Sequence, residues 1–339
     1  MKPTLPVLLV FTFLFKFSAM VVAQTELPNT DIYLLDITTD KKGKLQFQNP
    51  SLITKNDKYD NQPWWNAEGT YILYASVRDT FKSDIYKYNL PDRKTSVLIN
   101  TPLTSEYSPM LMANKINISV VQVVQDDTTQ ILAKCDNKED QCYNLLPKFK
   151  GQVAYYAWID ANRVAMYVLG DPATLLLADV STGKVDTIAE DVGRCVQKLP
   201  GKNLQIGFVD KSSNPWQIKL YDAKSKKITE VVPTLEEEED FCFMPDGSIL
   251  MGHESELFHY VPPASLIANT TTRTYTSSSY KGASKEVDKK EDKKANKNPN
   301  DPWEVVANFD GTAVEYFYRL AVSPKGDKIA IVTYEDEKP

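Results

Sequence analysis

The feature that most constrains this chain is a strand-like segment that recurs six times. Its copies read DIYLLD at 31–36, DIYKYN at 84–89, QILAKC at 130–135, TLLLAD at 174–179, QIKLYD at 217–222 and ELFHYV at 256–261. Equivalent apolar positions are spaced by 53, 46, 44, 43 and 39 residues. A period of about 40–45 residues with several strands per unit is typical of β-propeller blades. The repeat predicts an all-β, six-bladed β-propeller of four-stranded antiparallel blades.

Short polar turns recur with the same period and indicate hairpins. They lie at 66–69, 114–115, 160–162, 200–202, 245–247 and 324–327, each between two apolar segments. Proline fixes φ at the first turn position, while glycine and asparagine tolerate positive φ. We expect each turn to join the two inner strands of one blade.

The two ends of the chain carry complementary halves of one blade. The turn at Pro324 is followed by the apolar run 329–332, and the chain then ends. The N-terminal region supplies 31–36 and a further strand near 45–53, with no inner pair before them. Two strands from each end complete a blade and hide the sheet edges. The sequence thus predicts a ring closed by N- and C-terminal strands.

Residues 1–23 have the layout of a secretory signal peptide, and the propeller is expected to occupy 24–339. Lys2 supplies the positive charge, and an apolar run precedes a small-residue cleavage pattern that ends at Ala23. A membrane anchor is the alternative, but Lys16 interrupts the apolar stretch that a span needs. We therefore expect a periplasmic or extracellular protein with no membrane span after signal removal.

The charge balance disfavours nucleic acid as a partner. The chain has 39 basic and 45 acidic side chains and a net charge of −6. Removal of the leader, which contains two lysines, leaves a net charge of −8. Binding to DNA or RNA requires a concentrated basic face, which this acidic chain does not offer.

One stretch does not fit the repeat. Residues from about 264 to 302 are rich in Thr, Ser, Lys, Asp and Asn and almost free of apolar side chains. Such a segment cannot bury enough surface to order itself. We predict a disordered insertion in the last full blade, and an arm that docks a partner is the alternative.

The four cysteines suggest one disulfide. Cys135 and Cys142 enclose a polar turn between two strand-like runs, and an exported protein can oxidise them. Cys195 and Cys242 lie in two different inner strands. For this second pair, a disulfide and two buried free thiols both remain open.

The segment 62–89, QPWWNAEGTYILYASVRDTFKSDIYKYN, resembles the repeat of TolB-like, WD-repeat-like propellers. It has a proline before an aromatic strand, a glycine turn, a Ser-x-Arg-Asp segment and Asp-Ile-Tyr. The segment 318–332, YRLAVSPKGDKIAIV, has the same pattern. The resemblance implies structural roles for Arg78, Asp79 and Asp84. Together with the signal-like N-terminus and the lysine-rich insertion, it suggests a bacterial envelope protein. The resemblance covers the propeller of TolB without its extra N-terminal domain, so we do not expect a role in the Tol machinery.

Catalytic motifs are sparse. The only histidines are His253 and His259, and no Gly-x-Ser-x-Gly elbow or zinc-finger spacing accompanies them. His259 lies within a predicted strand, where packing is its expected role, whereas His253 lies in a loop that could face a ligand. The sequence therefore favours binding over catalysis and leaves catalysis open.

The loops that enter the inner strands and those that leave the second strands share one face of a propeller. We predict a binding face that comprises Tyr59, Asp60, Arg78, Asp79, Tyr107, Asp126, Asp127, Asp171, Glu238, Glu239, Asp240, His253 and Glu254. Convergent carboxylates could hold a hard cation such as calcium. The alternative is that these charged loops are only solvated.

The leading hypothesis is an exported, non-catalytic scaffold that binds an exported protein or a cell-envelope protein or polymer through these loops. One alternative is a calcium-dependent hydrolase or lyase that uses carboxylates at the channel mouth. The other is a propeller that binds a small ligand or carbohydrate through exposed aromatic side chains. The fold alone does not decide among them.

Overall fold

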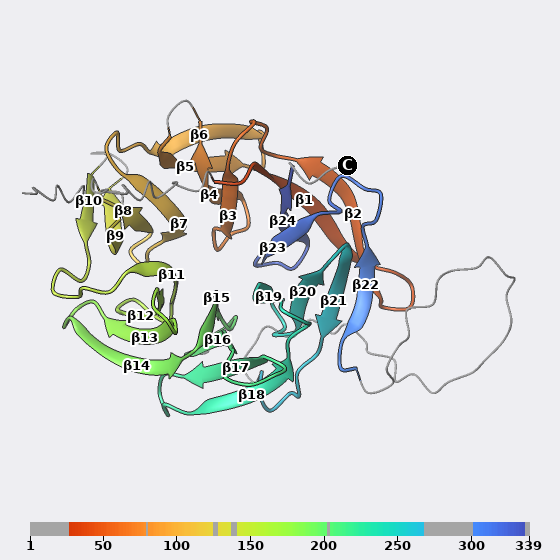
Figure 1. Cartoon of the computed structure of the whole chain (residues 1–339). Coiled ribbons are helices and arrows are strands. Elements are labelled where there is room, and N and C mark those ends of the chain that lie inside the picture. Colours follow the sequence, from red (N-terminus) through yellow and green to blue (C-terminus); the bar gives the residue numbers. More distant parts are fainter. Residues whose placement is uncertain are drawn as a thin grey trace, which may run out of the picture.

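The computed structural model describes residues 27–78, 81–124, 128–136, 141–201, 204–267 and 301–335. These residues form 24 strands in six four-stranded antiparallel sheets, and the described part of the chain contains no helix. The sheets stand around a common centre as the blades of a propeller (Figure 1). The predicted fold is confirmed. The predicted signal peptide and most of the predicted insertion lie outside the described residues.

Five blades are continuous in the chain, each running from its innermost strand outward. Blade 1 comprises β3 (Asp60–Trp65), β4 (Tyr71–Val77), β5 (Ser83–Asn89) and β6 (Lys94–Ile99). Blade 2 comprises β7 (Ser105–Leu111), β8 (Ile118–Val123), β9 (Gln130–Asp136) and β10 (Gln141–Asn144). Blade 3 comprises β11 (Val153–Trp158), β12 (Arg163–Val168), β13 (Thr174–Asp179) and β14 (Lys184–Glu190).

The next two blades repeat this order. Blade 4 comprises β15 (Val192–Lys198), β16 (Gln205–Asp210), β17 (Gln217–Asp222) and β18 (Ile228–Pro233). Blade 5 comprises β19 (Phe241–Phe243), β20 (Ile249–His253), β21 (Glu256–Tyr260) and β22 (Glu304–Asn308). The residues predicted to form an insertion fall between β21 and β22.

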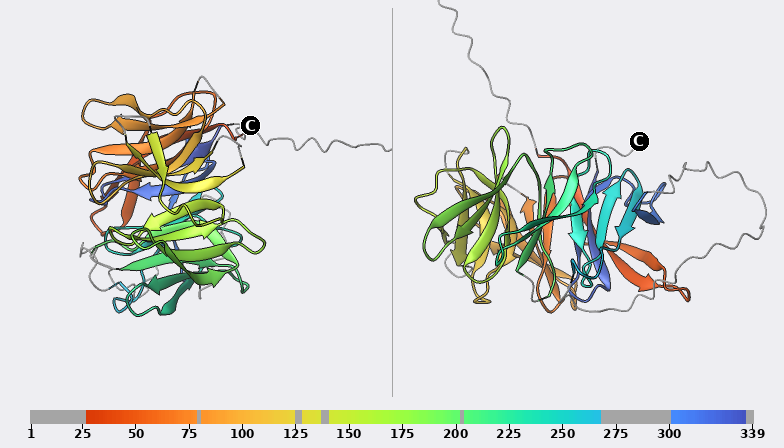
Figure 2. Two further views of the ribbon diagram at one scale, coloured as in Figure 1. Left: turned by 90° about the vertical axis from the view of Figure 1, so that its left-hand side faces the viewer. Right: turned by 90° about the horizontal axis from the view of Figure 1, so that it is seen from below.

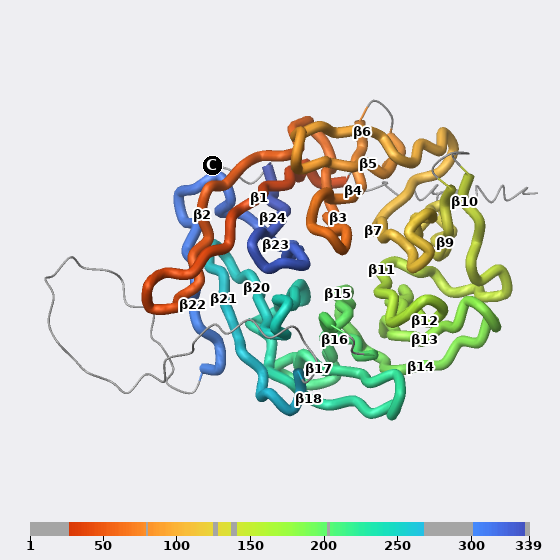
Figure 3. Tube along the Cα trace, turned by 180° about the vertical axis from the view of Figure 1, so that it is seen from behind, coloured from red at the N-terminus to blue at the C-terminus, as the bar shows by residue number. Residues whose placement is uncertain are grey.

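The closing blade is built from both ends of the chain, as predicted. Its strand order is β2-β1-β24-β23, from the outside inward. These strands are β1 (Thr30–Thr39), β2 (Leu45–Leu52), β23 (Phe317–Val322) and β24 (Lys328–Tyr334). Figure 3, which views the ring from behind, shows β1 beside β24. Because this blade hydrogen-bonds one end of the chain to the other, the ring is closed.

Burial explains why the second strand of each blade is continuously apolar. In β4 and β24 nearly every residue is buried, because a neighbouring blade covers each face of the strand. The outer strand β6 is mostly exposed, since it lies at the rim of the ring. A two-residue alternation is therefore weak in the inner strands, where both faces lie in a core.

The hydrophobic core is divided among the junctions between blades. Six clusters of buried apolar residues exist in the described part of the chain, and each joins two adjacent blades. One such cluster places Ile32, Ala330 and Val332 of the closing blade against Trp65 and Ile72 of blade 1. Each blade thus buries its two faces only when the ring is complete, which makes closure a condition of stability.

The predicted turns join the two innermost strands of the blades, as expected. Four of them contain a glycine at positive φ, and Gly69 at φ 68° and Gly326 at φ 66° are two examples. Both follow the polar start of a turn between an innermost strand and the next one, β3–β4 and β23–β24. At positive φ a Cβ atom would be strained, so glycine suits these positions.

Cys135 and Cys142 form the predicted disulfide. They are directly opposite each other in the β9–β10 ladder, which brings the two Cα atoms to 4.0 Å. Cys195 and Cys242 are free thiols and both are buried. Of the two alternatives for this second pair, the structure therefore selects buried free thiols.

The ring has two faces at which loops emerge, as Figure 2 shows from two further directions. One face is the face at which each innermost strand begins, as after residues 53–59, which precede β3. We call it the entry face. The loops between second and third strands, such as the one that leads from β4 to β5, emerge at the same face because neighbouring strands are antiparallel. Residues 27–29 also lie here, where β1 begins.

Candidate binding site on the entry face

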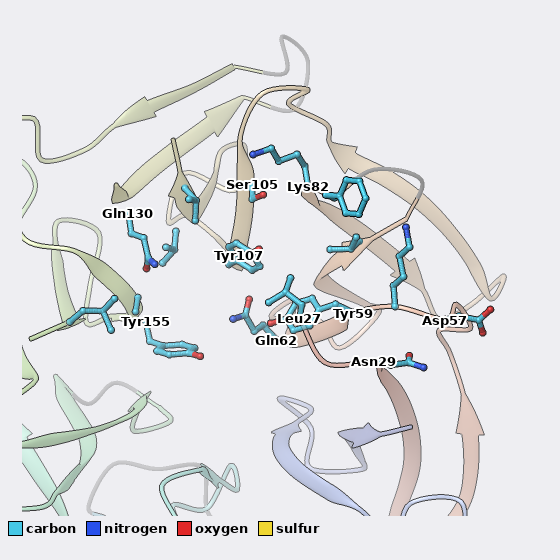
Figure 4. A pocket seen from close by; sticks show the side chains of 17 residues that line it. Leu27, Asn29, Asp57, Tyr59, Gln62, Lys82, Ser105, Tyr107, Gln130 and Tyr155 are labelled. Carbon is cyan, nitrogen blue, oxygen red and sulfur yellow. The ribbon is translucent and has the colours of Figure 1, made fainter. Parts of the chain in front are cut away.

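The entry face carries a hollow of about 1000 Å³ between blades 1, 2 and 3. Figure 4 shows the side chains that line it, which come from strands of blades 1, 2 and 3, from loops beside these strands and from the segment that precedes β1. The lining residues are Leu27, Asn29, Asp57, Lys58, Tyr59, Gln62, Val77, Phe81, Lys82, Ser105, Tyr107, Val121, Val123, Gln130, Ala154, Tyr155 and Leu169. The hollow therefore combines apolar, aromatic and polar groups from several blades, as binding pockets do.

Aromatic rings form the wall of this hollow. Tyr59 and Tyr107 meet edge to face, with ring centroids 6.1 Å apart. Tyr155 lies across the hollow on β11 (Figure 4). Burial raises the pKa of the Tyr59 hydroxyl well above its usual value, so this group is a neutral phenol at physiological pH. The wall thus offers flat apolar surfaces with hydroxyl groups at their edges.

Exposed apolar side chains gather at the same hollow. Phe81 is 96% exposed, and Leu27 and Leu169 are 44% and 46% exposed. All three line the hollow, although they come from different segments of the chain. Single exposed apolar residues are common on protein surfaces, but a group of them around one concavity indicates a contact site.

Asp60 and Arg78 are next in sequence to Tyr59 and Val77, which line the hollow, but do not line it themselves. The Asp60 side chain is fully buried and accepts a hydrogen bond from the Arg78 guanidinium, with Nη2 3.3 Å from Oδ1. Arg78 also donates to the Tyr74 hydroxyl at 3.2 Å and lies over the Tyr86 ring. Burial raises the pKa of Asp60 against the opposing effect of its partners, which include Asn56. These two predicted site residues connect strands within blade 1.

The predicted site residues Glu238 and Glu239, which precede blade 5, have hydrogen-bond partners in the protein. Glu239 Oε1 accepts a hydrogen bond from Lys211 Nζ at 2.6 Å, and its other oxygen accepts one from the Arg194 backbone at 2.9 Å. Glu238 Oε1 lies 3.1 Å from His253 Nδ1, and burial raises the pKa of this carboxyl. Both carboxylates therefore have partners in the protein, and neither they nor His253 line the hollow.

The remaining predicted site residues do not join these groups. Asp171 is exposed in the loop between β12 and β13, and Glu254 is exposed between β20 and β21. Asp79, Asp126 and Asp127 lie outside the described residues. In the described part of the chain, no three His, Cys, Asp or Glu side chains gather in a way that could hold a metal ion.

Asp240 belongs to a second group of residues, in the centre of the ring. Its Oδ2 atom accepts two hydrogen bonds from Arg194, from Nε at 3.1 Å and from Nη2 at 2.7 Å. Nε of Arg319 lies 3.8 Å from its other oxygen. The sequence predicted Asp240 as part of the binding face but did not predict either arginine as a site residue. Both arginines are the third residue of an innermost strand, β15 and β23, and this shared position could have identified them.

Comparison with solved structures identifies the fold. A TolB structure from Agrobacterium tumefaciens superposes over 91% of this chain and 98% of its own length, with a TM-score of 0.58 and 12% identity. The chain has the fold of TolB-like propellers. TolB from Acinetobacter baumannii matches over 68% of this chain with a TM-score of 0.51 and 14% identity, and the match spans 61% of that TolB. No family profile and no curated protein matches the sequence.

An oligogalacturonate lyase from Vibrio parahaemolyticus also matches, over 92% of this chain and 100% of its own, with 11% identity and a TM-score of 0.47. At such identities a TolB-like fold is shown, and function is not.

Among the residues that the structure describes, no helix has the length and apolarity needed to cross a membrane.

Proposed function

We propose that this TolB-like propeller is an exported binding protein that holds a protein partner at the hollow on its entry face. The observation that carries the proposal is the convergence of exposed Phe81, Leu27 and Leu169 on one concavity of about 1000 Å³. Exposed apolar groups around a concave, partly polar surface are typical of sites that bind another molecule. The Cys135–Cys142 disulfide and the leader-like N-terminus support export.

The chemistry of the rim defines the kind of partner. Asp57 is the one carboxylate among the described residues that line the hollow, and Lys58 and Lys82 are the two cations. Their ammonium groups favour a partner with acidic residues beside an apolar anchor, because opposite charges guide association and an apolar anchor gives affinity. A segment with an aromatic or aliphatic side chain flanked by Asp or Glu therefore fits this face best.

The distribution of the acidic groups favours binding over metal-assisted hydrolysis or elimination. A calcium-dependent enzyme would need at least three oxygen-bearing side chains to converge at the channel mouth. In the described residues, Asp60 is paired with Arg78, and Glu239 with Lys211. These carboxylates have cationic partners from the protein itself and do not converge on a common point.

Site-specific photocrosslinking tests the proposed function. A photoreactive phenylalanine analogue replaces Phe81 in the exported full-length protein, and the matched control replaces Ile116. Ile116 is also exposed, at 61%, but lies in the turn between β7 and β8 at the opposite face. We expect a defined crosslinked product from position 81 that position 116 does not give, and we expect Leu169→Asp to abolish it. The same products from both positions, or none from position 81, would overturn the proposal.

A further inference from the structure

A second hollow, of about 450 Å³, lies in the central channel. The innermost strands of all six blades line it, through segments such as 62–65 of β3 and 319–322 of β23. Gln62 and Tyr155 line both this hollow and the one on the entry face. The channel is therefore adjacent to the entry-face hollow, but its lining has a different chemical character.

The charged residues of the channel lining are mainly cationic. Among the described residues that line it, Arg194, Lys198 and Arg319 carry positive charge, and Asp240 carries the negative charge. The chain as a whole is acidic, with a net charge of −6. An excess of cations inside the ring of an acidic protein is a local feature that favours an anionic ligand.

The two arginines are held in fixed positions. Arg319 donates from Nη1 to Asn61 Oδ1 at 2.8 Å, and its guanidinium lies over the Tyr155 and Tyr318 rings at 5.3 and 5.5 Å. Arg194 binds Asp240 through two nitrogen atoms. Stacking and hydrogen bonds orient each guanidinium before a ligand arrives, which lowers the entropy that binding costs.

One carboxylate does not balance the two guanidiniums. The Asp240 side chain is 6% exposed, and Arg319 is 14% exposed, so both are largely removed from water. Arg194 is 40% exposed and can be reached from the channel. Asp240 shows that these guanidiniums accept a carboxylate in this position, and the surplus charge favours a second one. The planar fork of arginine suits the two oxygens of a carboxylate.

Aromatic side chains narrow the ligand class further. Trp64, Trp158 and Tyr155 line the same channel as the two arginines. Their rings provide flat apolar surfaces on which a planar group can stack. A ligand that combines a carboxylate with a flat apolar body would satisfy both parts of the lining.

We propose that the central channel is a binding site for a carboxylate attached to a planar apolar group, with Arg194 and Arg319 as the anion contacts. This site is distinct from the partner-binding face proposed above and does not depend on it. The carboxylate can belong to a free aromatic acid or to the C-terminal residue of a peptide, since both present the same group.

Titration with benzoate and benzamide tests the chemistry. The two probes have nearly the same shape, but only benzoate carries a negative charge. We expect benzoate to change the fluorescence of the channel tryptophans saturably and to raise the Tm of the full-length protein, because a ligand of the native state stabilises it. Benzamide should do so at least tenfold more weakly. Equal affinity for the two probes, or no binding of benzoate, would overturn the proposal.

Three variants locate the site. Arg194→Gln should weaken benzoate binding at least tenfold, and the conservative Arg194→Lys should recover part of the affinity. Asp240→Asn should tighten binding, because it removes the carboxylate that competes for the guanidiniums. The control is Lys184→Gln, which removes a cation from the exposed outer strand β14. Equal losses in Arg194→Gln and Lys184→Gln would show only a general charge effect and would contradict the assignment.

A pair of peptides distinguishes the two sources of the carboxylate. Gly-Gly-Phe with a free C-terminus and the same peptide with a C-terminal amide are titrated in parallel. Binding of the free acid alone supports the channel site and assigns it to chain ends. Binding of benzoate without either peptide supports the site and assigns it to small free acids. Equal binding of acid and amide would contradict a carboxylate site.

Discussion

Ile32 in β1 pairs with Val332 in β24, so residues from opposite ends of the chain are neighbours in the middle of one blade. Neither side chain is exposed, and both belong to the cluster that joins the closing blade to blade 1. The carboxylate of Asp36 adds an ion pair to Lys328 within the same pair of strands. Ring closure therefore depends on a buried apolar junction rather than on a flexible contact between termini.

Shortening Val332 should weaken this junction. Val332→Ala leaves a small cavity at a fully buried position, so we expect a loss of about 2 kcal/mol in the free energy of unfolding. The matched control is Val97→Ala in the outer strand β6, where the side chain is 49% exposed and the loss should stay below about 0.5 kcal/mol. Urea unfolding measures both. Equal losses would contradict the burial of β24 within a closed ring.

The number of reactive thiols should depend on reduction. After unfolding in denaturant without a reductant, a thiol reagent should detect two groups, because Cys135 and Cys142 are joined. Prior reduction should raise the number to four. In the native protein Cys195 should react slowly, since burial raises its pKa to about 12 and the thiolate is the reactive form. The detection of no thiol in unreduced, unfolded protein would mean that Cys195 and Cys242 are paired.

Glu106 should make stability depend on pH. Its side chain is fully buried, Oε1 accepts hydrogen bonds from Thr104 and Gln122, and Oε2 has no hydrogen-bond partner. Burial raises the pKa of this carboxyl above 4.5, so the folded state holds the proton more strongly than the unfolded state does. Its contribution to stability is therefore greatest below about pH 4.5 and falls as the pH rises through the folded-state pKa.

Glu106→Gln removes this titration. We expect the free energy of unfolding of the variant, minus that of the wild type, to be more positive at pH 7 than at pH 4. Urea unfolding at both pH values measures this difference. Glu190→Gln is the control, because Glu190 is exposed at the end of the outer strand β14. If the difference between Glu106→Gln and wild type did not change with pH, Glu106 would not be the titrating group.

The predictions that succeeded rest on interactions close together in the sequence. The spacing of the repeated strands gave the number of blades, and the polar turns gave the connections of the inner strands. Cys135 and Cys142 flank one hairpin, so their cross-strand pairing follows from local antiparallel geometry. Such features are determined by turn chemistry and by hydrogen bonding between adjacent segments, which one repeat already contains.

The structure places only some of the residues of the predicted binding face at the hollow, for a physical reason. Tyr59 and Tyr107 line the hollow, whereas Asp60 is turned inward to Arg78. In an inner strand both faces pack on neighbouring blades, so residue alternation does not tell which side chain reaches solvent. The pairing of a loop carboxylate with a cation depends on the neighbouring segment in space, which the repeat does not specify.

The sequence by itself determined the six blades, their hairpins and the division of the closing blade between the two termini. These features follow from strand and turn motifs that recur at a regular spacing along the sequence. Only the tertiary structure decided that Arg194 and Arg319 meet at Asp240, since these residues come from three blades and lie up to 125 positions apart. Ring closure brings them together, because each blade can bury its two apolar faces only against the neighbouring blades.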